Sequence, residues 1–184
     1  MTARASKALV SVIVLASLLL LIYVVRQRLR VSVYVPPKAT SERIGPPELY
    51  PDLSQTPGAT DPRVTQENVA DTICIAGWTA TVRPPAHVMH SLKMRMMRAN
   101  DVLGQPSGYE LDHFVPLELG GCADCETNLW LEPYQPEPGA RQKDQVENYL
   151  HRQVCDGTMT LKAAQQQIAM DWYKVYLQIS SNHR

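Results

Sequence analysis

The sequence predicts an α+β domain that follows one N-terminal transmembrane helix. Three observations lead to this prediction. Residues 8–25 form an uncharged, apolar run that is rich in Leu, Val and Ile. Residues 109–119 have the composition of a β-strand segment and end at Gly120-Gly121, a pair that is typical of turns. Two long segments near the C-terminus carry apolar residues at three- and four-residue spacing, which is the pattern of amphipathic helices.

The apolar run of residues 8–25 has the length of a membrane span. At a helical rise of about 1.5 Å per residue it would extend roughly 27 Å, close to the hydrocarbon thickness of a bilayer. A cleaved signal peptide is the alternative, but its apolar region usually has about 7–15 residues and ends in small residues. Here the run ends in Tyr-Val-Val, so we favour an uncleaved anchor over residues 1–30. Basic residues flank the run on both sides, so they do not decide its orientation.

Residues 31–63 are predicted to form a proline-rich linker. Seven of the 14 prolines lie in this segment. Prolines at such short intervals prevent a long helix and favour an extended, semi-rigid chain. The globular domain is therefore predicted to comprise residues 64–184.

Within 64–184 the predicted elements have local sequence reasons. Thr65 is a favourable N-cap for a short helix, and Pro84 ends a segment with the composition of a strand. The predicted elements are, in order, a helix over 66–73, a strand over 78–82, a helix over 86–98, a hairpin arm over 109–119, a helix over 140–154 and a last helix after Thr160. The helix over 86–98 is expected to pack through Val88, Leu92 and Met96.

One stretch of the domain carries several motifs in a fixed order. Asp112-His113 lies on the hairpin arm, the sequence PLELGG follows at 116–121, and the sequence NLW at 128–130 precedes the helix over 140–154. This order of strand, glycine turn, asparagine and helix resembles the ββα-metal finger of the HNH endonuclease superfamily. A wider similarity, which runs from 56–58 to 157, resembles a group of exported bacterial HNH-like proteins.

The resemblance implies a metal-dependent endonuclease that hydrolyses phosphodiester bonds of DNA or RNA. His113 would be the general base, Asp112 would bind Mg²⁺ or Mn²⁺ (Zn²⁺ is less favoured), and Asn128 would orient the loop that faces His113. The residues alone agree with this role for His113, because a neutral imidazole near pH 7 accepts a proton from water. Adjacent residues of a regular strand point to opposite faces. Asp112 and His113 therefore share a site only if the strand ends or bulges between them.

The start of the helix over 140–154 lacks the His or Asn ligand that the family commonly supplies, because residues 139–141 are Gly-Ala-Arg. Glu147 and Asp144 are the available substitutes, and Glu147 is preferred because it lies nearer the apolar stripe. The alternative is a surface ion pair between Lys143 and Glu147, which lie one helical turn apart. The missing ligand also supports an alternative function, a catalytically weak or inactive, membrane-tethered binding module on the same scaffold.

Two basic residues are the preferred candidates for contacts with substrate phosphates. Arg83 lies beside the Pro-Pro stop, and Lys143 lies near the presumed site. Eighteen basic residues balance 18 acidic residues, so no overall field attracts a polyanion, and we expect little sequence specificity. Nucleic acid and the membrane, through residues 8–25, are the predicted partners, and no protein partner is predicted.

Four cysteines permit either disulfides or a zinc site. A Cys74–Cys155 disulfide is the preferred interpretation, and Cys122 and Cys125 either pair within their loop or remain reduced. The alternative is a four-thiolate zinc site in a cytoplasmic domain. A Cys74–Cys155 bridge needs an oxidising compartment. The chain is therefore predicted to be a single-pass membrane protein whose domain lies outside the cytoplasm, in the periplasm or at the cell surface.

Overall fold

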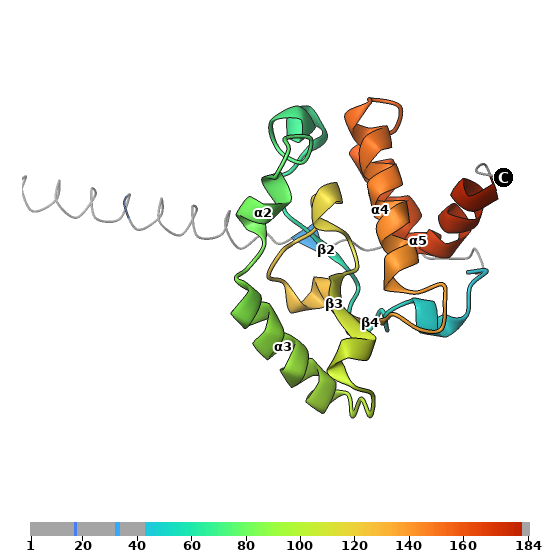
Figure 1. The fold of residues 1–184 in the computed structure, drawn as a ribbon. Helices are drawn as coiled ribbons and strands as arrows, with labels where there is room; N and C mark the ends of the chain where they lie inside the picture. Colours follow the sequence, from blue (N-terminus) through green and yellow to red (C-terminus); the bar gives the residue numbers. More distant parts are fainter. Residues whose placement is uncertain (1–16, 18–31, 34–42, 182–184) are drawn as a thin grey trace, which may run out of the picture. The chain divides into compact units, whose positions relative to one another are not determined.

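Figure 1 shows the computed structural model, which describes residue 17, residues 32–33 and residues 43–181. All of the elements below belong to one unit, Ser32–Arg184. Within the part of the chain that the structure describes, no helix has both the length and the apolar character needed to cross a membrane. The predicted span, residues 8–25, lies outside the described residues except for Ser17.

The centre of the unit is an antiparallel pair of strands, β3 (Tyr109–His113) and β4 (Leu129–Pro133), which pair along their full length. Helix α3 (Ala86–Ala99) contacts both strands, and helix α4 (Ala140–Cys155) contacts β3. In Figure 1 the hairpin lies between these two helices. Helices and a small sheet in one unit confirm the α+β class.

The shorter elements are irregular connections that run over this centre. They are β1 (Ser32–Val33), β2 (Ala59–Thr60), α2 (Trp78–Val82) and the 3₁₀ helices η1 (Pro47–Leu49), η2 (Gln66–Asp71), η3 (Pro106–Gly108), η4 (Leu117–Leu119) and η5 (Glu126–Asn128). Strand β1 pairs antiparallel with β2.

The main core lies between α4 and the last helix, α5 (Leu161–Ser181). Helix α4 turns Val146, Leu150 and Val154 inward at four-residue spacing, as an amphipathic helix does. Trp172 of α5 is buried in the same core, and its indole N–H donates a hydrogen bond of 2.8 Å to the carbonyl oxygen of Leu49. Each fully buried apolar side chain of this kind contributes roughly 1.5–3 kcal/mol to stability.

Helix α5 is interrupted at Asp171, whose backbone is not helical (φ −163°, ψ 77°). The Asp171 carboxylate accepts hydrogen bonds from the backbone N–H of Lys174 at 3.0 Å and of Ile44 at 3.1 Å, and from the Tyr50 hydroxyl at 2.5 Å. The bond from Lys174 has the form of an N-cap, so Asp171 starts the second half of the helix. The same carboxylate attaches the segment that contains Ile44 and Tyr50 to α5.

The predicted domain boundary at Val64 is too late, because residues assigned to the linker pack into the core. Leu49 and Tyr50 are buried there, and the Arg43 guanidinium donates hydrogen bonds to two carbonyl oxygens of α5. Proline excludes a long helix, but it is compatible with the start of a short 3₁₀ helix and with extended chain that packs on a neighbour. In residues 43–63 the proline density therefore marks irregular backbone and not a separate tether.

The strand predicted over 78–82 is wrong, because these residues form the helix α2. Gly77 has a positive φ of 81°, which glycine adopts readily, and turns the chain into the helix. A strand also needs a partner for its backbone hydrogen bonds, and among the described strands none pairs with this segment. The β-like composition of 78–82 therefore does not correspond to a sheet surface.

Two predicted elements are shorter in the structure. The hairpin arm over 109–119 ends at His113, because Pro116 has no N–H for the ladder and the residues after it form η4. The chain returns as β4 only after the loop 114–128. The helix predicted over 66–73 is the 3₁₀ helix η2, at whose start the Asn68 side chain accepts a hydrogen bond of 2.8 Å from the backbone N–H of Thr65.

The helices predicted over 86–98 and 140–154 are confirmed as α3 and α4, and the last predicted helix is confirmed as α5. On α3 the buried residues are Leu92 and Met97, whereas Val88 is exposed. The hairpin is small, so it covers only a narrow stripe of α3. The predicted Cys74–Cys155 disulfide is confirmed and joins the segment after η2 to the end of α4.

We predict that replacing Cys74 and Cys155 with Ala lowers the free energy of unfolding by roughly 2–5 kcal/mol, because this crosslink restricts a long loop of the unfolded chain. The bridged residues are 81 positions apart. Chemical unfolding of the full-length chain measures the loss. The control is the Cys122→Ala/Cys125→Ala variant, which removes a disulfide between residues only 3 positions apart. A loss in the control as large as that in the first variant would contradict the prediction.

Candidate functional site

Asp112 and His113 lie at the end of β3, in an unbroken ladder. Asp112 pairs with Trp130 and His113 pairs with Leu129, so the strand neither ends nor bulges between the two candidate residues. Their side chains therefore point to opposite faces of the hairpin. Asp112 meets α4, and His113 meets the loop between β3 and β4. A shared site would require both side chains on one face of the hairpin, and the structure does not place them there.

The His113 ring is held in one tautomer by a backbone carbonyl. Its Nε2 lies 3.0 Å from the carbonyl oxygen of Ala123. A carbonyl oxygen only accepts hydrogen bonds, so Nε2 carries the proton and Nδ1 carries the lone pair. Burial lowers the pKa of His113, and the positive charges of Arg83 and Lys143 lower it further, against the opposing effects of the Ala123 carbonyl and Asp112. At pH 7 the imidazole is therefore neutral, with a basic Nδ1.

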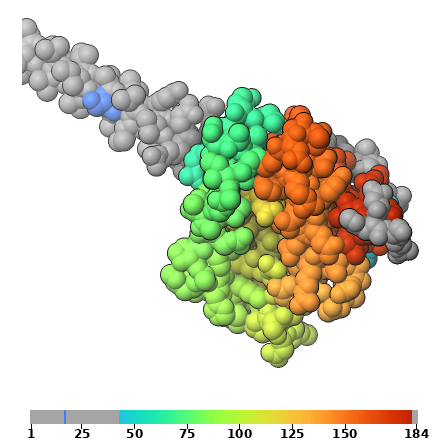
Figure 2. Space-filling model, turned by 45° about the horizontal axis from the view of Figure 1, so that its top comes forward, coloured from blue at the N-terminus to red at the C-terminus, as the bar shows by residue number. Residues whose placement is uncertain are grey.

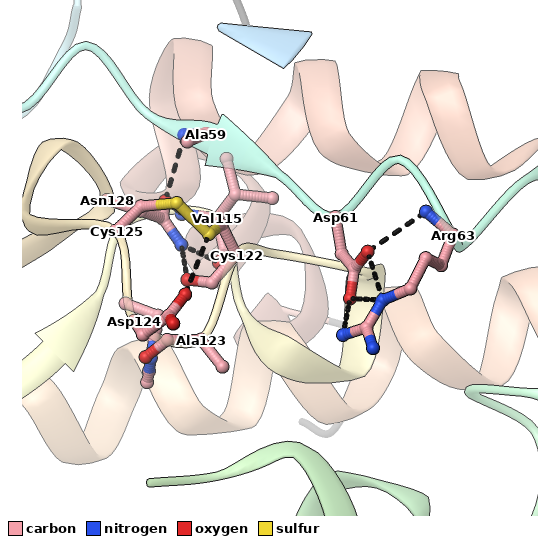
Figure 3. The surroundings of a disulfide bond; sticks show 10 residues. Ala59, Asp61, Arg63, Val115, Cys122, Ala123, Asp124, Cys125 and Asn128 are labelled. Atoms are coloured by element: carbon pink, nitrogen blue, oxygen red, sulfur yellow. Dashed lines mark hydrogen bonds and ion pairs between the residues drawn. A yellow bond between two sulfur atoms is a disulfide. The ribbon is translucent and has the colours of Figure 1, made fainter. Parts of the chain in front are cut away.

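The loop that carries the Ala123 carbonyl is fixed by Asn128. The Asn128 Oδ1 accepts hydrogen bonds from the backbone N–H of Val115 at 2.9 Å and of Ala59 at 3.2 Å. Its Nδ2 donates to the carbonyl oxygens of Val115 and Cys122, both at 3.0 Å. Asn128 is fully buried, and these four bonds use its whole amide group. All four bonds go to the backbone of the loop and of Ala59, and Figure 3 shows Asn128 among these partners, so Asn128 acts on the His113 ring through the loop.

A second disulfide, Cys122–Cys125, encloses Ala123 within the same loop (Figure 3). This resolves the alternative left open for these two cysteines. All four cysteines are in disulfides, so the four-thiolate zinc site does not form. Among the described residues, two groups of three side chains bring potential metal-ligand atoms within 4.8 Å of one another, and both contain a disulfide. Disulfide sulfurs are not the thiolates that bind metals.

On the other face of the hairpin, Lys143 is surrounded by three carboxyl groups. Its Nζ lies 2.5 Å from Asp112 Oδ2 and 3.7 Å from Glu132 Oε2, and it also donates to Glu147 Oε1. A further bond of 3.1 Å reaches the backbone carbonyl oxygen of His113. The side chains of Lys143 and Glu132 are each only 1% exposed. The Lys143–Glu147 ion pair therefore exists, but it is buried and not on the surface.

The environment of these four groups sets their charges. Burial raises the pKa of Glu132 well above 4.5, and the neighbouring Asp112 charge raises it further. Burial also raises the pKa of Glu147 to about 8, although Lys143 opposes this. Burial opposes ionisation of Asp112 too, but the Lys143 ammonium keeps the pKa of Asp112 below 3.8. The same carboxylates hold the pKa of Lys143 well above 10.5, against the effect of burial.

Glu132 was not singled out from the sequence, and it completes this cluster. Neither of its oxygens receives a hydrogen bond from the surrounding groups. The raised pKa of Glu132 fits this, because burial favours the protonated, uncharged form of a carboxyl group. At neutral pH the cluster is then one charged pair, Asp112 and Lys143, with two uncharged acids, Glu132 and Glu147. The sequence signal that could have found Glu132 is its position two residues after Trp130, which places both side chains on the same face of β4.

The predicted metal ligands Asp112 and Glu147 are brought together, but around an ammonium group. Mg²⁺ requires oxygen ligands at about 2.0–2.1 Å in octahedral geometry and usually keeps several waters. The Lys143 Nζ occupies the point on which these carboxylates converge, so a metal ion at that point would have to displace the ammonium group. As arranged, the residues do not fit a divalent metal. The metal itself stays a prediction from the sequence.

The two predicted phosphate contacts differ in accessibility. Arg83 is the exposed C-cap of α2, and its charge acts on His113. Lys143 uses its three N–H groups on Asp112, Glu147 and the His113 carbonyl, so it offers no donor to a substrate. Figure 2 shows a hollow between the green helices α2 and α3 and the orange α4, with the yellow central segment at its floor.

No protein-family model, curated protein or solved structure matches this chain.

We predict that Glu147→Gln reduces the loss of stability on raising the pH from 6.5 to about 8. The folded-state pKa of Glu147, about 8, lies above the unfolded value, so its contribution is full below the unfolded value and is lost as the pH rises through 8. His113 has a lowered pKa, so its contribution rises with pH and levels off above the unfolded value of about 6.5, equally in wild type and in Glu147→Gln.

Urea unfolding of the full-length chain at several pH values between 6.5 and 8 measures the difference. Glutamine keeps an oxygen for Lys143 and resembles the protonated acid. The exposed Glu126→Gln is the control and should follow the wild-type pH dependence. Parallel curves for wild type and Glu147→Gln would show that Glu147 is ionised throughout the window.

Proposed function

We propose that the domain hydrolyses phosphodiester bonds of DNA or RNA, with His113 as general base, on a hairpin-and-helix unit of the HNH type. The order β3, β4, α4 supports the unit, with Asp112-His113 at the end of the first strand and Asn128 directly before the second. The observation that carries the proposal is the bond between His113 Nε2 and the Ala123 carbonyl oxygen. It leaves Nδ1 as the basic nitrogen of a neutral imidazole.

The chemistry follows from these positions. A water molecule would give a proton to His113 Nδ1 while its oxygen attacks phosphorus. The bond between phosphorus and the leaving oxygen would break, and the leaving oxygen would keep the electron pair and take a proton from solvent. Arg83 is the exposed cation that acts on His113, and its guanidinium would hold a non-bridging phosphate oxygen. Asn128 and the Cys122–Cys125 disulfide would keep the Ala123 carbonyl in place, so their role is positioning.

A catalytically weak or inactive binding module on the same scaffold is the second candidate. Two observations favour it: the His113 side chain is only 2% exposed, and the cluster around Lys143 is neutral as a whole. A buried base needs an opening to water, and a neutral cluster offers no net charge to a phosphate. Hydrolysis by the folded protein separates the two candidates.

We also propose that the domain acts outside the cytoplasm, tethered through residues 8–25. Both disulfides are of the kind that persists in an oxidising compartment. The apolar character of residues 8–25 is the sequence observation behind the tether.

We predict that His113→Gln lowers the rate of nucleic acid cleavage by roughly 10²–10⁴-fold, the usual contribution of a general base. Glutamine keeps an N–H for the Ala123 carbonyl but does not accept a proton near pH 7. The full-length protein is incubated with supercoiled plasmid and with single-stranded RNA, in the presence of Mg²⁺, Mn²⁺ or chelator.

The exposed His90→Ala variant on α3 is the matched control and should cleave like the wild type. Cleavage by His113→Gln at the wild-type rate would remove His113 from the reaction. No cleavage of either substrate by well-folded wild-type protein would favour the binding module.

A further inference from the structure

We propose that the Lys143 ammonium group is the resident cation of this site. It occupies the position between Asp112 and Glu147 that a divalent metal would need, so the wild-type site does not bind Mg²⁺ or Mn²⁺. This inference rests on the proposed function, because it concerns how the same site meets its need for positive charge. The supporting observations are contacts within the protein, and the test needs no nucleic acid.

The first argument is the convergence of three carboxyl groups on one atom. Asp112 comes from β3, Glu132 from β4 and Glu147 from α4, and the distances to Lys143 Nζ include 2.5 Å from Asp112 and 3.7 Å from Glu132. Oxygen atoms from three separate elements around one buried point are the donor set of a hard cation. Here the ammonium group occupies that point.

The second argument is that Lys143 is held there by all of its donors. Its three N–H groups are used on Asp112 Oδ2, Glu147 Oε1 and the backbone carbonyl oxygen of His113. A metal would have to expel the ammonium and break these three bonds. The bond to the His113 carbonyl has no replacement within the cluster, so the exchange would also disturb the end of β3.

The third argument is the unused capacity of Glu132. This side chain is 1% exposed, faces Lys143, and receives no hydrogen bond on either oxygen. Three ionised carboxylates and one ammonium would leave two negative charges in a buried space. The Lys143 ammonium offsets one of the three carboxylate charges, whereas a divalent cation in its place would offset two.

The experiment therefore asks whether removing the ammonium exposes a metal site. Methionine is an unbranched, apolar residue that fills the space of the lysine stem without its charge. Thermal unfolding of the full-length wild type, Lys143→Met and Lys143→Met/Glu147→Gln is followed with chelator and with millimolar Mn²⁺. We expect no change in Tm for wild type, a rise of at least about 2–4 °C for Lys143→Met, and loss of that rise in the double variant.

A Mn²⁺-dependent rise of the wild-type Tm that Glu147→Gln abolishes would overturn the proposal. So would a folded Lys143→Met variant that does not respond to Mn²⁺. If Lys143→Met does not fold, electron paramagnetic resonance of Mn²⁺ titrated into wild type decides the matter. An undiminished signal of free Mn²⁺ supports the proposal, and stoichiometric binding that Glu147→Gln removes contradicts it. These outcomes do not depend on cleavage, so failure here is distinct from failure of the proposed nuclease.

Discussion

The arrangement of the hairpin against α4 depends on one buried ammonium group. Lys143 Nζ contacts a side chain and the backbone of β3, a side chain of β4 and a second side chain of its own helix. A buried charge is tolerated only when it is paired and hydrogen-bonded, and removing one partner of a buried pair commonly costs about 3–5 kcal/mol. The two strands and the helix are thus held in one orientation, because any other would leave Lys143 or Asp112 unpaired in the interior.

The neighbouring residue of β3 serves the opposite face. Alternation along the strand directs Asp112 to the cluster and His113 to the loop between β3 and β4. There Asn128 fixes the backbone on both sides of the loop, and the Cys122–Cys125 disulfide closes it around Ala123. One face of the hairpin therefore provides the charge that orders the fold, and the other presents a neutral imidazole with a defined tautomer. The two faces meet in the backbone of His113, whose carbonyl oxygen accepts a bond from Lys143.

Features of the fold that depend on local sequence could be predicted. The helices α3, α4 and α5 have apolar residues at helical spacing, and the Asp-His pair and Asn128 stand at the two ends of the β3–β4 loop. The strand predicted over 78–82 failed because composition does not reveal whether a partner strand is present. Residues 43–63 were assigned to a linker because proline spacing indicates irregular backbone but not whether it packs on a core.

The burial and the partners of Lys143 could not be predicted from the sequence, because most of those partners come from other elements. Lysine is almost never fully buried unless it is paired, and a helical wheel shows only its own helix, on which Glu147 is the evident partner. The other partners, Asp112 and Glu132, come from two strands.

The most direct test is a nuclear magnetic resonance correlation of lysine ammonium groups. A buried, hydrogen-bonded Lys143 predicts one slowly exchanging ammonium signal that millimolar Mg²⁺ leaves unchanged, whereas a rapidly exchanging group, or a signal that Mg²⁺ displaces, would contradict it.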